Sequence, residues 1–134
     1  MAPESPPPPP LPTILVVDDE DPVRAFVRDA LASEGYTVFE TGDPLEARRL
    51  VETRAVQLLL TDVVMPRMNG LELAERVQAA SPTTKVLMMS GFMTPPMKAS
   101  GRPILAKPFT IDALLRAVRE AVGGRSAFRR PDTR

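Results

Sequence analysis

Short apolar runs rich in β-branched residues alternate with longer amphipathic stretches along most of the chain. The runs are TILVV (13–17), YTVFE (36–40), QLLLT (57–61), KVLMM (85–89) and ILA (104–106). We interpret each as a buried strand, because a strand that is covered on both faces is apolar throughout. The stretches between them place apolar side chains at helical spacing. Strict alternation of strand and helix restricts the fold to an α/β architecture, a parallel sheet with helices on both faces.

Capping residues indicate where several of the helices begin. Asp21 before Pro22, and Asp43 before Pro44, each place a capping carboxylate ahead of a proline that suits the first helical position. Thr110 is in place to cap the last helix. With right-handed crossovers, five such strands allow a doubly wound parallel sheet of order 2-1-3-4-5.

Carboxylates follow the two strands at which this order reverses. The ligand crevice of such a sheet lies at the carboxyl ends of strands 1 and 3. Asp18 and Asp19 follow the first strand, and Asp62 follows the third. Unpaired acids there would raise each other's pKa, and Mg²⁺ is the hard cation that suits such oxygen ligands. Of the neighbouring acids, we expect Glu20 to be solvated and Asp21 to cap a helix.

A hydroxyl and an ammonium follow the two remaining strands at the same edge. Ser90 comes after the fourth strand and Lys107 after the fifth. With Mg²⁺ and a carboxylate nucleophile they suit phosphoryl transfer, which depends on positioning and on neutralising oxygen charge. The carboxylate can accept the phosphoryl group as an acyl phosphate. Each residue alone fits a turn or a surface position, so their joint placement carries the prediction.

The totals exclude several other classes of chemistry. A length of 134 residues suits one domain, and 17 basic residues balance 17 acidic ones. This balance argues against non-specific nucleic-acid binding, and we expect no direct DNA binding. The chain contains no cysteine and no histidine, which excludes thiolate and imidazole metal sites and a phosphohistidine of its own. No apolar run approaches the roughly 18 residues of a membrane span, so we expect a cytoplasmic protein.

The two ends of the chain differ in composition from the middle. Pro6–Pro10 is an unbroken proline run that favours an extended polyproline II conformation. We expect residues 1–12 to be a disordered proline-rich tail rather than a ligand for an aromatic groove. Residues 123–134 contain four arginines and are expected to be a flexible basic tail. The folded domain is then residues 13–122.

In order and spacing the chain resembles the response-regulator receiver domain, of the CheY-like superfamily, in four motifs: ILVVDDE, TDVVMPRMNG, MMSG and AKPFT. The resemblance covers about residues 13–122 and implies a single-domain, flavodoxin-like protein of two-component signalling. It implies that Asp62 is the phosphoacceptor, that Ser90 and Lys107 contact the phosphoryl group, and that the peptide bond before Pro108 is cis. The chain would act as a switch that assists its own phosphorylation and dephosphorylation, not as a conventional enzyme.

The resemblance also implies the metal ligands. Asp18 and Asp19 would hold Mg²⁺ together with Asp62, with Asp19 the more direct ligand, and Val64 would add its backbone carbonyl. Val64 and Phe92 would flank the phosphoryl group, where apolar side chains cannot orient an attacking water. We therefore expect slow self-dephosphorylation.

The expected partners are proteins. Because the chain has no histidine, the phosphoryl group would come from another protein, a sensor histidine kinase or a histidine phosphotransfer protein, or from a small phosphodonor. The signal would then pass to an unidentified downstream protein, and a homodimer is one contact that could change.

The chain departs from the receiver pattern near the fourth helix. Only residues 91–106 separate Ser90 from Lys107, and they include two adjacent prolines and the fifth strand. A full fourth helix does not fit there, so we expect it to be shortened or missing. Ile104 also stands where many members of the family carry a switching Tyr or Phe. Receiver domains usually signal through the face formed by the fourth helix, the fifth strand and the fifth helix, and these departures put signalling through that face in doubt.

Parts of the sequence also fit other functions. The segment DEDPV (19–23) matches the D-x-D-x-V motif of haloacid dehalogenase-like phosphohydrolases, in which Asp19 would be the nucleophile and Asp21 the acid. The chain is short for that family and has no late acidic pair for Mg²⁺. A receiver-like module without phosphate chemistry and a receiver domain of a hybrid histidine kinase are further alternatives. FMN binding is disfavoured, since the acids after the first strand would repel its phosphate.

Overall fold

The computed structural model describes residues 11–91 and 93–123. Its strands are β1 (Thr13–Val17), β2 (Thr37–Thr41), β3 (Leu58–Asp62), β4 (Lys85–Ser90) and β5 (Ile104–Ala106). Its helices are α1 (Asp21–Ser33), α2 (Pro44–Thr53), α3 (Gly70–Ala80), α4 (Pro95–Ser100) and α5 (Ile111–Gly123). Most of the two predicted tails, residues 1–10 and 124–134, lies outside the described residues.

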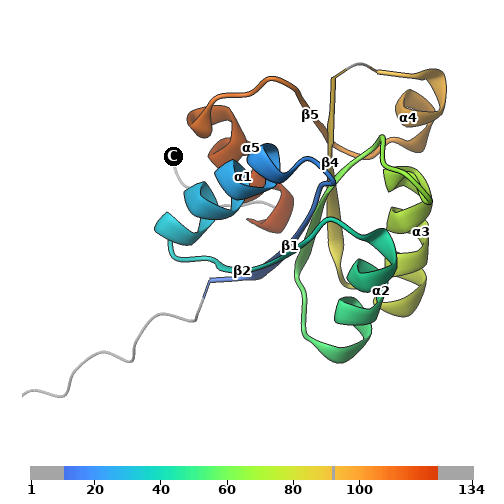
Figure 1. Cartoon of the computed structure of the whole chain (residues 1–134), viewed down its shortest axis with the longest axis horizontal. Helices are drawn as coiled ribbons and strands as arrows, with labels where there is room; N and C mark the ends of the chain where they lie inside the picture. Colours follow the sequence, from blue (N-terminus) through green and yellow to red (C-terminus); the bar gives the residue numbers. More distant parts are fainter. Residues whose placement is uncertain (1–10, 92, 124–134) are drawn as a thin grey trace, which may run out of the picture.

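All five strands are parallel and follow the order β2-β1-β3-β4-β5. This confirms the predicted doubly wound sheet. Helices α1 and α5 cover one face, and α2 and α3 cover the other (Figure 1). In the strand register Val17 pairs with both Thr41 and Thr61, and Asp62 pairs with Met89. The strands therefore end almost level, which brings the loops that follow them to one edge.

Two apolar layers fill the space between the sheet and its helices. Along β1, Ile14 and Val16 pack in the layer under α1 and α5, whereas Leu15 and Val17 pack in the layer under α2 and α3. All four side chains are fully buried. The strands read as continuous apolar runs in the sequence because both of their faces are covered.

The start of α1 corrects one prediction. Asp21 is the first residue of the helix and Glu20 occupies the capping position, so Asp21 does not cap it. A proline fits anywhere in the first turn, where backbone N–H groups have no helical partner, and Pro22 therefore did not identify the cap. Asp21 instead forms an ion pair with Arg24, with 2.6 Å between carboxylate oxygen and guanidinium nitrogen.

The starts of α2 and α5 agree with the prediction. The Asp43 carboxylate accepts a hydrogen bond from the backbone N–H of Leu45, and the Thr110 hydroxyl oxygen accepts one from that of Ala113. These contacts satisfy N–H groups that have no partner within the helix. None of the described helices is long and apolar enough to cross a membrane.

Helix α4 is only six residues long, Pro95–Ser100, which confirms the expected shortening. Thr94 caps its start, and Gly101 ends it in the left-handed region, at φ 69°. Directly after it, Arg102 donates a hydrogen bond of 2.7 Å to the side-chain oxygen of Gln78 on α3. The short helix is therefore tied to α3 at its exit.

Candidate functional site

Three carboxylates converge at the carboxyl edge of the sheet. One oxygen each from Asp18, Glu20 and Asp62 lies within 4.8 Å of the other two. Asp18 follows β1 and is fully buried, and Asp62 is the last residue of β3 and only 6% exposed. Acidic side chains therefore gather at the edge where the strand order reverses, as the sequence predicted.

Lys107 neutralises part of this charge. Its Nζ lies 3.2 Å from Asp18 Oδ2, 3.3 Å from Glu20 Oε1 and 3.4 Å from Asp62 Oδ1. Its backbone N–H donates to the carbonyl of Ser90 at 2.8 Å, which holds the exit of β5 against β4. The Lys107–Pro108 peptide bond is cis, as the family resemblance implied. The structure thus brings the predicted ammonium to the predicted acids.

Asp18 is held by its backbone as well as its side chain. Its N–H donates to the carbonyl of Thr41 on β2 at 3.2 Å, and its Oδ1 accepts from the N–H of Glu20 at 2.9 Å. Its own carbonyl accepts a 2.6 Å hydrogen bond from the guanidinium of Arg24. The carboxylate therefore has a fixed direction relative to the sheet.

Asp62 is packed tightly against the start of α3. Its Oδ1 accepts a hydrogen bond from the N–H of Val63 at 2.9 Å, and the N–H of Gly70 donates to the Val63 carbonyl at 2.8 Å. A Cβ atom at Gly70 would collide with the Asp62 carbonyl oxygen and with Val63 Cα. The side chain of Asn69 caps α3 by accepting a hydrogen bond from the N–H of Glu72, so Gly70 is the first residue of the helix. The sequence motif contains Gly70, but this close approach was not predicted from it.

The buried charges shift one another's protonation. Burial raises the pKa of Asp18, and burial followed by the charge of Asp18 raises the pKa of Asp62. Burial alone would lower the pKa of Lys107, but Asp18 and Asp62 outweigh it and raise that pKa. A bound divalent cation would stabilise the ionised form of both acids, so the donor set fits one.

The remaining predicted site residues are placed differently. Asp19 is exposed and does not belong to the described carboxylate cluster, so its role as a ligand stays a prediction. Glu20 is exposed over 60% of its side chain, as expected, but it also joins the cluster, which was not predicted. Ser90 is buried at the end of β4, and Val64 is 65% exposed beside Asp62. Phe92 lies outside the described residues.

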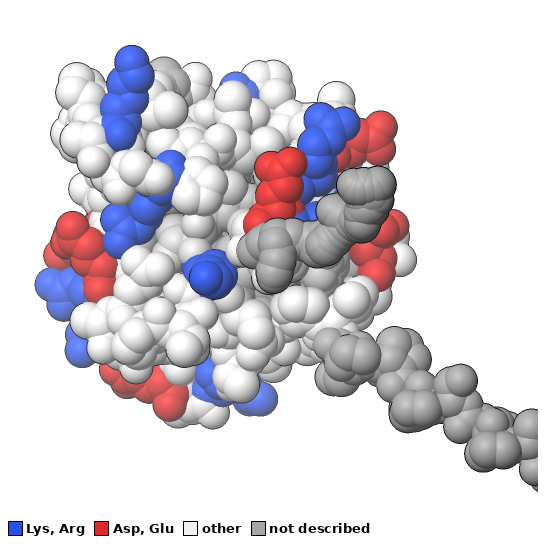
Figure 2. Space-filling model, turned by 180° about the vertical axis from the view of Figure 1, so that it is seen from behind, with Lys and Arg blue, Asp and Glu red and all other residues white. Residues whose placement is uncertain are grey.

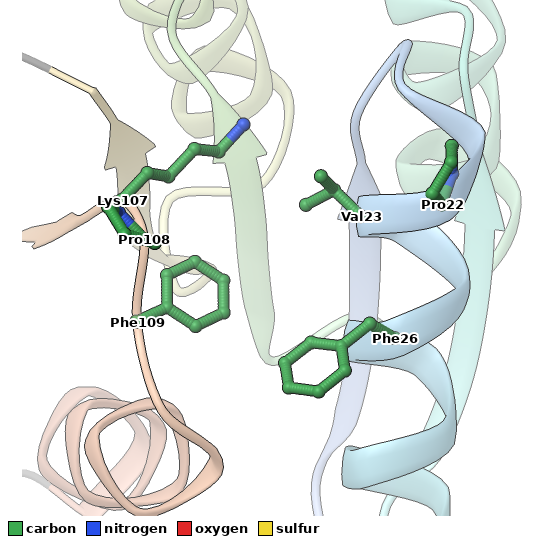
Figure 3. Close-up of a pocket in the computed structure, with 6 residues that line it drawn as sticks. All are labelled: Pro22, Val23, Phe26, Lys107, Pro108 and Phe109. Atoms are coloured by element: carbon green, nitrogen blue, oxygen red, sulfur yellow. The ribbon is translucent and has the colours of Figure 1, made fainter.

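An apolar groove of about 490 Å³ adjoins the acidic cluster on the side of α1. Its lining residues are Pro22, Val23, Phe26, Lys107, Pro108 and Phe109 (Figure 3). The rings of Phe26 and Phe109 face each other across it, with centroids 6.3 Å apart, and Phe26 is 42% exposed. The acidic site is therefore bordered by an accessible apolar surface.

The back of the molecule carries a mixed distribution of charge. Basic and acidic side chains form small groups there among neutral residues (Figure 2). Neither sign of charge covers the whole of the described part of that face. This agrees with the net charge of zero over the whole sequence.

The sequence matches a known protein family over most of its length. The family model of the response regulator receiver domain matches residues 14–119. The chain belongs to this family. Receiver domains are signalling modules of two-component systems rather than catalysts, and they interact with histidine kinases and phosphotransfer proteins. This receiver domain therefore has its acidic cluster at the edge where the fold places ligands.

Similar proteins include both short and long chains. The receiver domain is 33% identical over 110 residues to the response regulator receiver protein CpdR of Brucella abortus, covering 78% of this chain and 92% of CpdR. It is 36% identical over 115 residues to the DNA-binding transcriptional regulator NtrC of Azospirillum brasilense, covering 82% of this chain but only 24% of NtrC. Among solved structures, chemotaxis protein CheY4 of Vibrio cholerae aligns with a TM-score of 0.77 and 30% identity, covering 83% of this chain and 98% of CheY4.

Proposed function

We propose that the chain is a phosphoacceptor response regulator in which Asp62 takes a phosphoryl group from a phosphohistidine. The donor is a sensor histidine kinase or a histidine phosphotransfer protein, because this chain contains no histidine. The observation that carries the proposal is the position of Asp62. It is buried at the end of β3, clustered with Asp18 and Glu20, and its Oδ1 lies 3.4 Å from the ammonium of Lys107.

The proposed phosphoryl transfer needs only the donor phosphohistidine and Asp62 as reactants. The P–N bond of the donor phosphohistidine breaks as a P–O bond forms to an Asp62 oxygen, and the imidazole nitrogen takes the electron pair. Lys107 neutralises the negative charge on the transferred oxygens, and Ser90 donates its hydroxyl to one of them. Ser90 is the last residue of β4, which pairs with β3, and Lys107 follows β5, which pairs with β4. Their backbones are therefore fixed before the donor arrives.

Asp18, Asp19, Asp62 and the carbonyl of Val64 are the groups that we propose to hold Mg²⁺. The ion supplies charge neutralisation for the phosphoryl group when it is bound. Two buried acids with raised pKa values support a cation here, because one lysine is shared among three carboxylates.

Which of Asp19 and Glu20 acts as the Mg²⁺ ligand can be tested by titrating Mg²⁺ into two variants and measuring the heat of binding. We expect Asp19→Asn to weaken Mg²⁺ binding more than Glu20→Gln. The reverse order would move the ligand role from Asp19 to Glu20, whose carboxylate lies in the cluster.

Phosphorylation would be read out through altered protein contacts. We infer that the chain acts in the cytoplasm as a switch whose downstream target is a protein, not DNA. A helix α4 of six residues leaves less helical surface at that position than a full-length helix would. We therefore place the contacts with downstream proteins on α1, α5 or the 91–102 segment, and a homodimer is included among those contacts.

The proposal is tested by incubating the purified chain with a small acyl phosphate and Mg²⁺ and measuring its intact mass. The matched variants are Asp62→Asn and Asp29→Asn, the latter an acid on the exposed surface of α1. We expect one phosphoryl group on the wild type and on Asp29→Asn, and none on Asp62→Asn or after chelation of Mg²⁺. An Asp62→Asn variant that is labelled as fully as the wild type would overturn the assignment. Transfer from the histidine kinases of the source organism then identifies the donor.

A further inference from the structure

Arg24, in the first turn of α1, connects three segments around the acidic cluster. One guanidinium nitrogen donates to the backbone carbonyl of Asp18 at 2.6 Å, and the other lies 2.6 Å from the Asp21 carboxylate. Its Nε donates to Glu40 on β2 at 3.0 Å. The Arg24 side chain is only 18% exposed. Its charge is thus committed to contacts within the fold.

The Asp18 carbonyl lies where β1 leaves the sheet. The N–H of the same residue still bonds to Thr41, the last residue of β2, but the next position on that side is Gly42. A Cβ atom on Gly42 would lie 3.0 Å from the terminal nitrogen of Arg24 and 3.5 Å from the Asp18 carbonyl oxygen. The missing side chain leaves room for the guanidinium, which satisfies a buried carbonyl that would otherwise lack this partner.

Glu40 holds the guanidinium in place from the opposite side. One Glu40 oxygen accepts from Arg24, and the other accepts from Arg28 at 2.7 Å. Arg28 lies one helical turn further along α1 and donates to Glu40 and to Asp29, two residues that lie away from the Asp18 carbonyl. The two arginines therefore share Glu40 as an anchor, but Arg24 is the one that contacts the site.

We propose that Arg24 is a positioning residue for the metal site. By fixing the peptide between Asp18 and Asp19, it sets the direction from which these two carboxylates face the site. The inference rests on the Mg²⁺ site of the proposed function and extends it to a residue that does not itself contact the ion. Groups that orient metal ligands in this way typically change metal affinity by about 10- to 100-fold when they are lost.

Calorimetric titration of Mg²⁺ into the full chain tests the proposal. We expect Arg24→Met to bind Mg²⁺ about tenfold more weakly than the wild type, at the lower end of that range. Arg28→Met is the matched control, because it removes a cation from the same Glu40 without touching Asp18, and it keeps the wild-type affinity. Urea unfolding of both variants separates a change in stability from a change in the site. Phosphorylation by an acyl phosphate is then expected to need a higher Mg²⁺ concentration in Arg24→Met than in Arg28→Met.

A second variant covers the case in which Arg24→Met does not fold. Gly42→Ala keeps every charge but crowds the terminal nitrogen of Arg24, and we expect a smaller loss of Mg²⁺ affinity in the same direction. A folded Arg24→Met with the affinity of Arg28→Met would overturn the inference, as would an unchanged Gly42→Ala where Arg24→Met is unfolded. A wild-type chain that binds no Mg²⁺ would instead overturn the proposed function, so the two failures are distinguishable.

Discussion

The middle of the sheet and its carboxyl edge differ in what their buried side chains contribute. In the middle of β3, Leu58, Leu59 and Leu60 are fully buried and remove apolar surface from water. Two residues further along the same strand, Asp62 is almost as buried, but burial and the charge of Asp18 raise its pKa. The middle therefore stabilises the fold, whereas the edge destabilises it and is suited to a ligand. Stability and function are separated along the length of the same strands.

Removing apolar volume from the middle of the sheet has the largest expected effect. Leu59→Ala leaves a cavity between the sheet and the layer of α2 and α3, and we expect it to lower the free energy of unfolding by about 3 kcal/mol. Leu45→Ala is the matched control, since Leu45 is 47% exposed on α2 and its loss is expected to cost under about 0.5 kcal/mol. Urea unfolding measures both. Similar losses in the two variants would contradict the assignment of stability to the middle.

Crowding the point where α3 meets the edge comes next. Gly70→Ala forces a Cβ atom into the backbone of Asp62 and Val63. Because the backbone there cannot shift without disturbing the strand, we expect the free energy of unfolding to fall by about 2 kcal/mol. Gly91→Ala is the control, since a Cβ atom there meets nothing within 4 Å. Thermal melting compares the two. If Gly70→Ala melts with the control, the close approach of α3 to β3 is not what the structure indicates.

Neutralising the edge should stabilise the protein. Because the pKa of Asp62 is raised in the folded state, the folded chain holds this proton more firmly than the unfolded chain does. The wild type therefore loses stability as the pH rises from the unfolded pKa to the folded one. Asn does not titrate. In the absence of divalent cations, we therefore expect Asp62→Asn to raise the free energy of unfolding by about 1 kcal/mol at neutral pH, and by less in acid. Urea unfolding across a pH series measures it, and a loss of stability at neutral pH would contradict the comparison.

The smallest expected effect concerns the lifetime of the phosphorylated edge. Val64 stands two residues after Asp62 and is exposed, and its apolar side chain carries no group that could orient a water molecule. We expect Val64→Asn to speed the loss of the phosphoryl group a few-fold, a barrier change of about 1 kcal/mol or less. Val64→Ala, which stays apolar, keeps the wild-type rate. Release of inorganic phosphate after removal of the donor gives both rates, and equal rates for Asn and Val would refute the idea.

The middle was also far more predictable from the sequence than the edge. Continuous apolar runs identify strands covered on both faces, so the sheet, its order and the short α4 were expected correctly. Strand ends were less certain. Strand β3 was expected to stop before Asp62, but it includes this residue. Its backbone still pairs with Met89 on β4, although its side chain is polar.

The details of the edge depend on contacts between segments that are distant in sequence. Three consecutive acids lie between β1 and α1, and the direction of each depends on a turn that is held by Thr41 and Arg24. Local patterns do not reveal such contacts. Glu20 is exposed, as expected, but its place in the carboxylate cluster was not predicted. Residue types and spacing nevertheless brought attention to Asp18, Asp62 and Lys107, which the structure places together.

The position of the phosphoryl group tests the central claim most directly. The chain is phosphorylated with a small acyl phosphate and Mg²⁺. The aspartyl phosphate formed on the protein is then reduced with borohydride to homoserine, and the modified residue is located by peptide mass spectrometry. We predict homoserine at position 62, with Asp19 unmodified. Homoserine at position 19 would contradict the account and support the phosphohydrolase alternative instead.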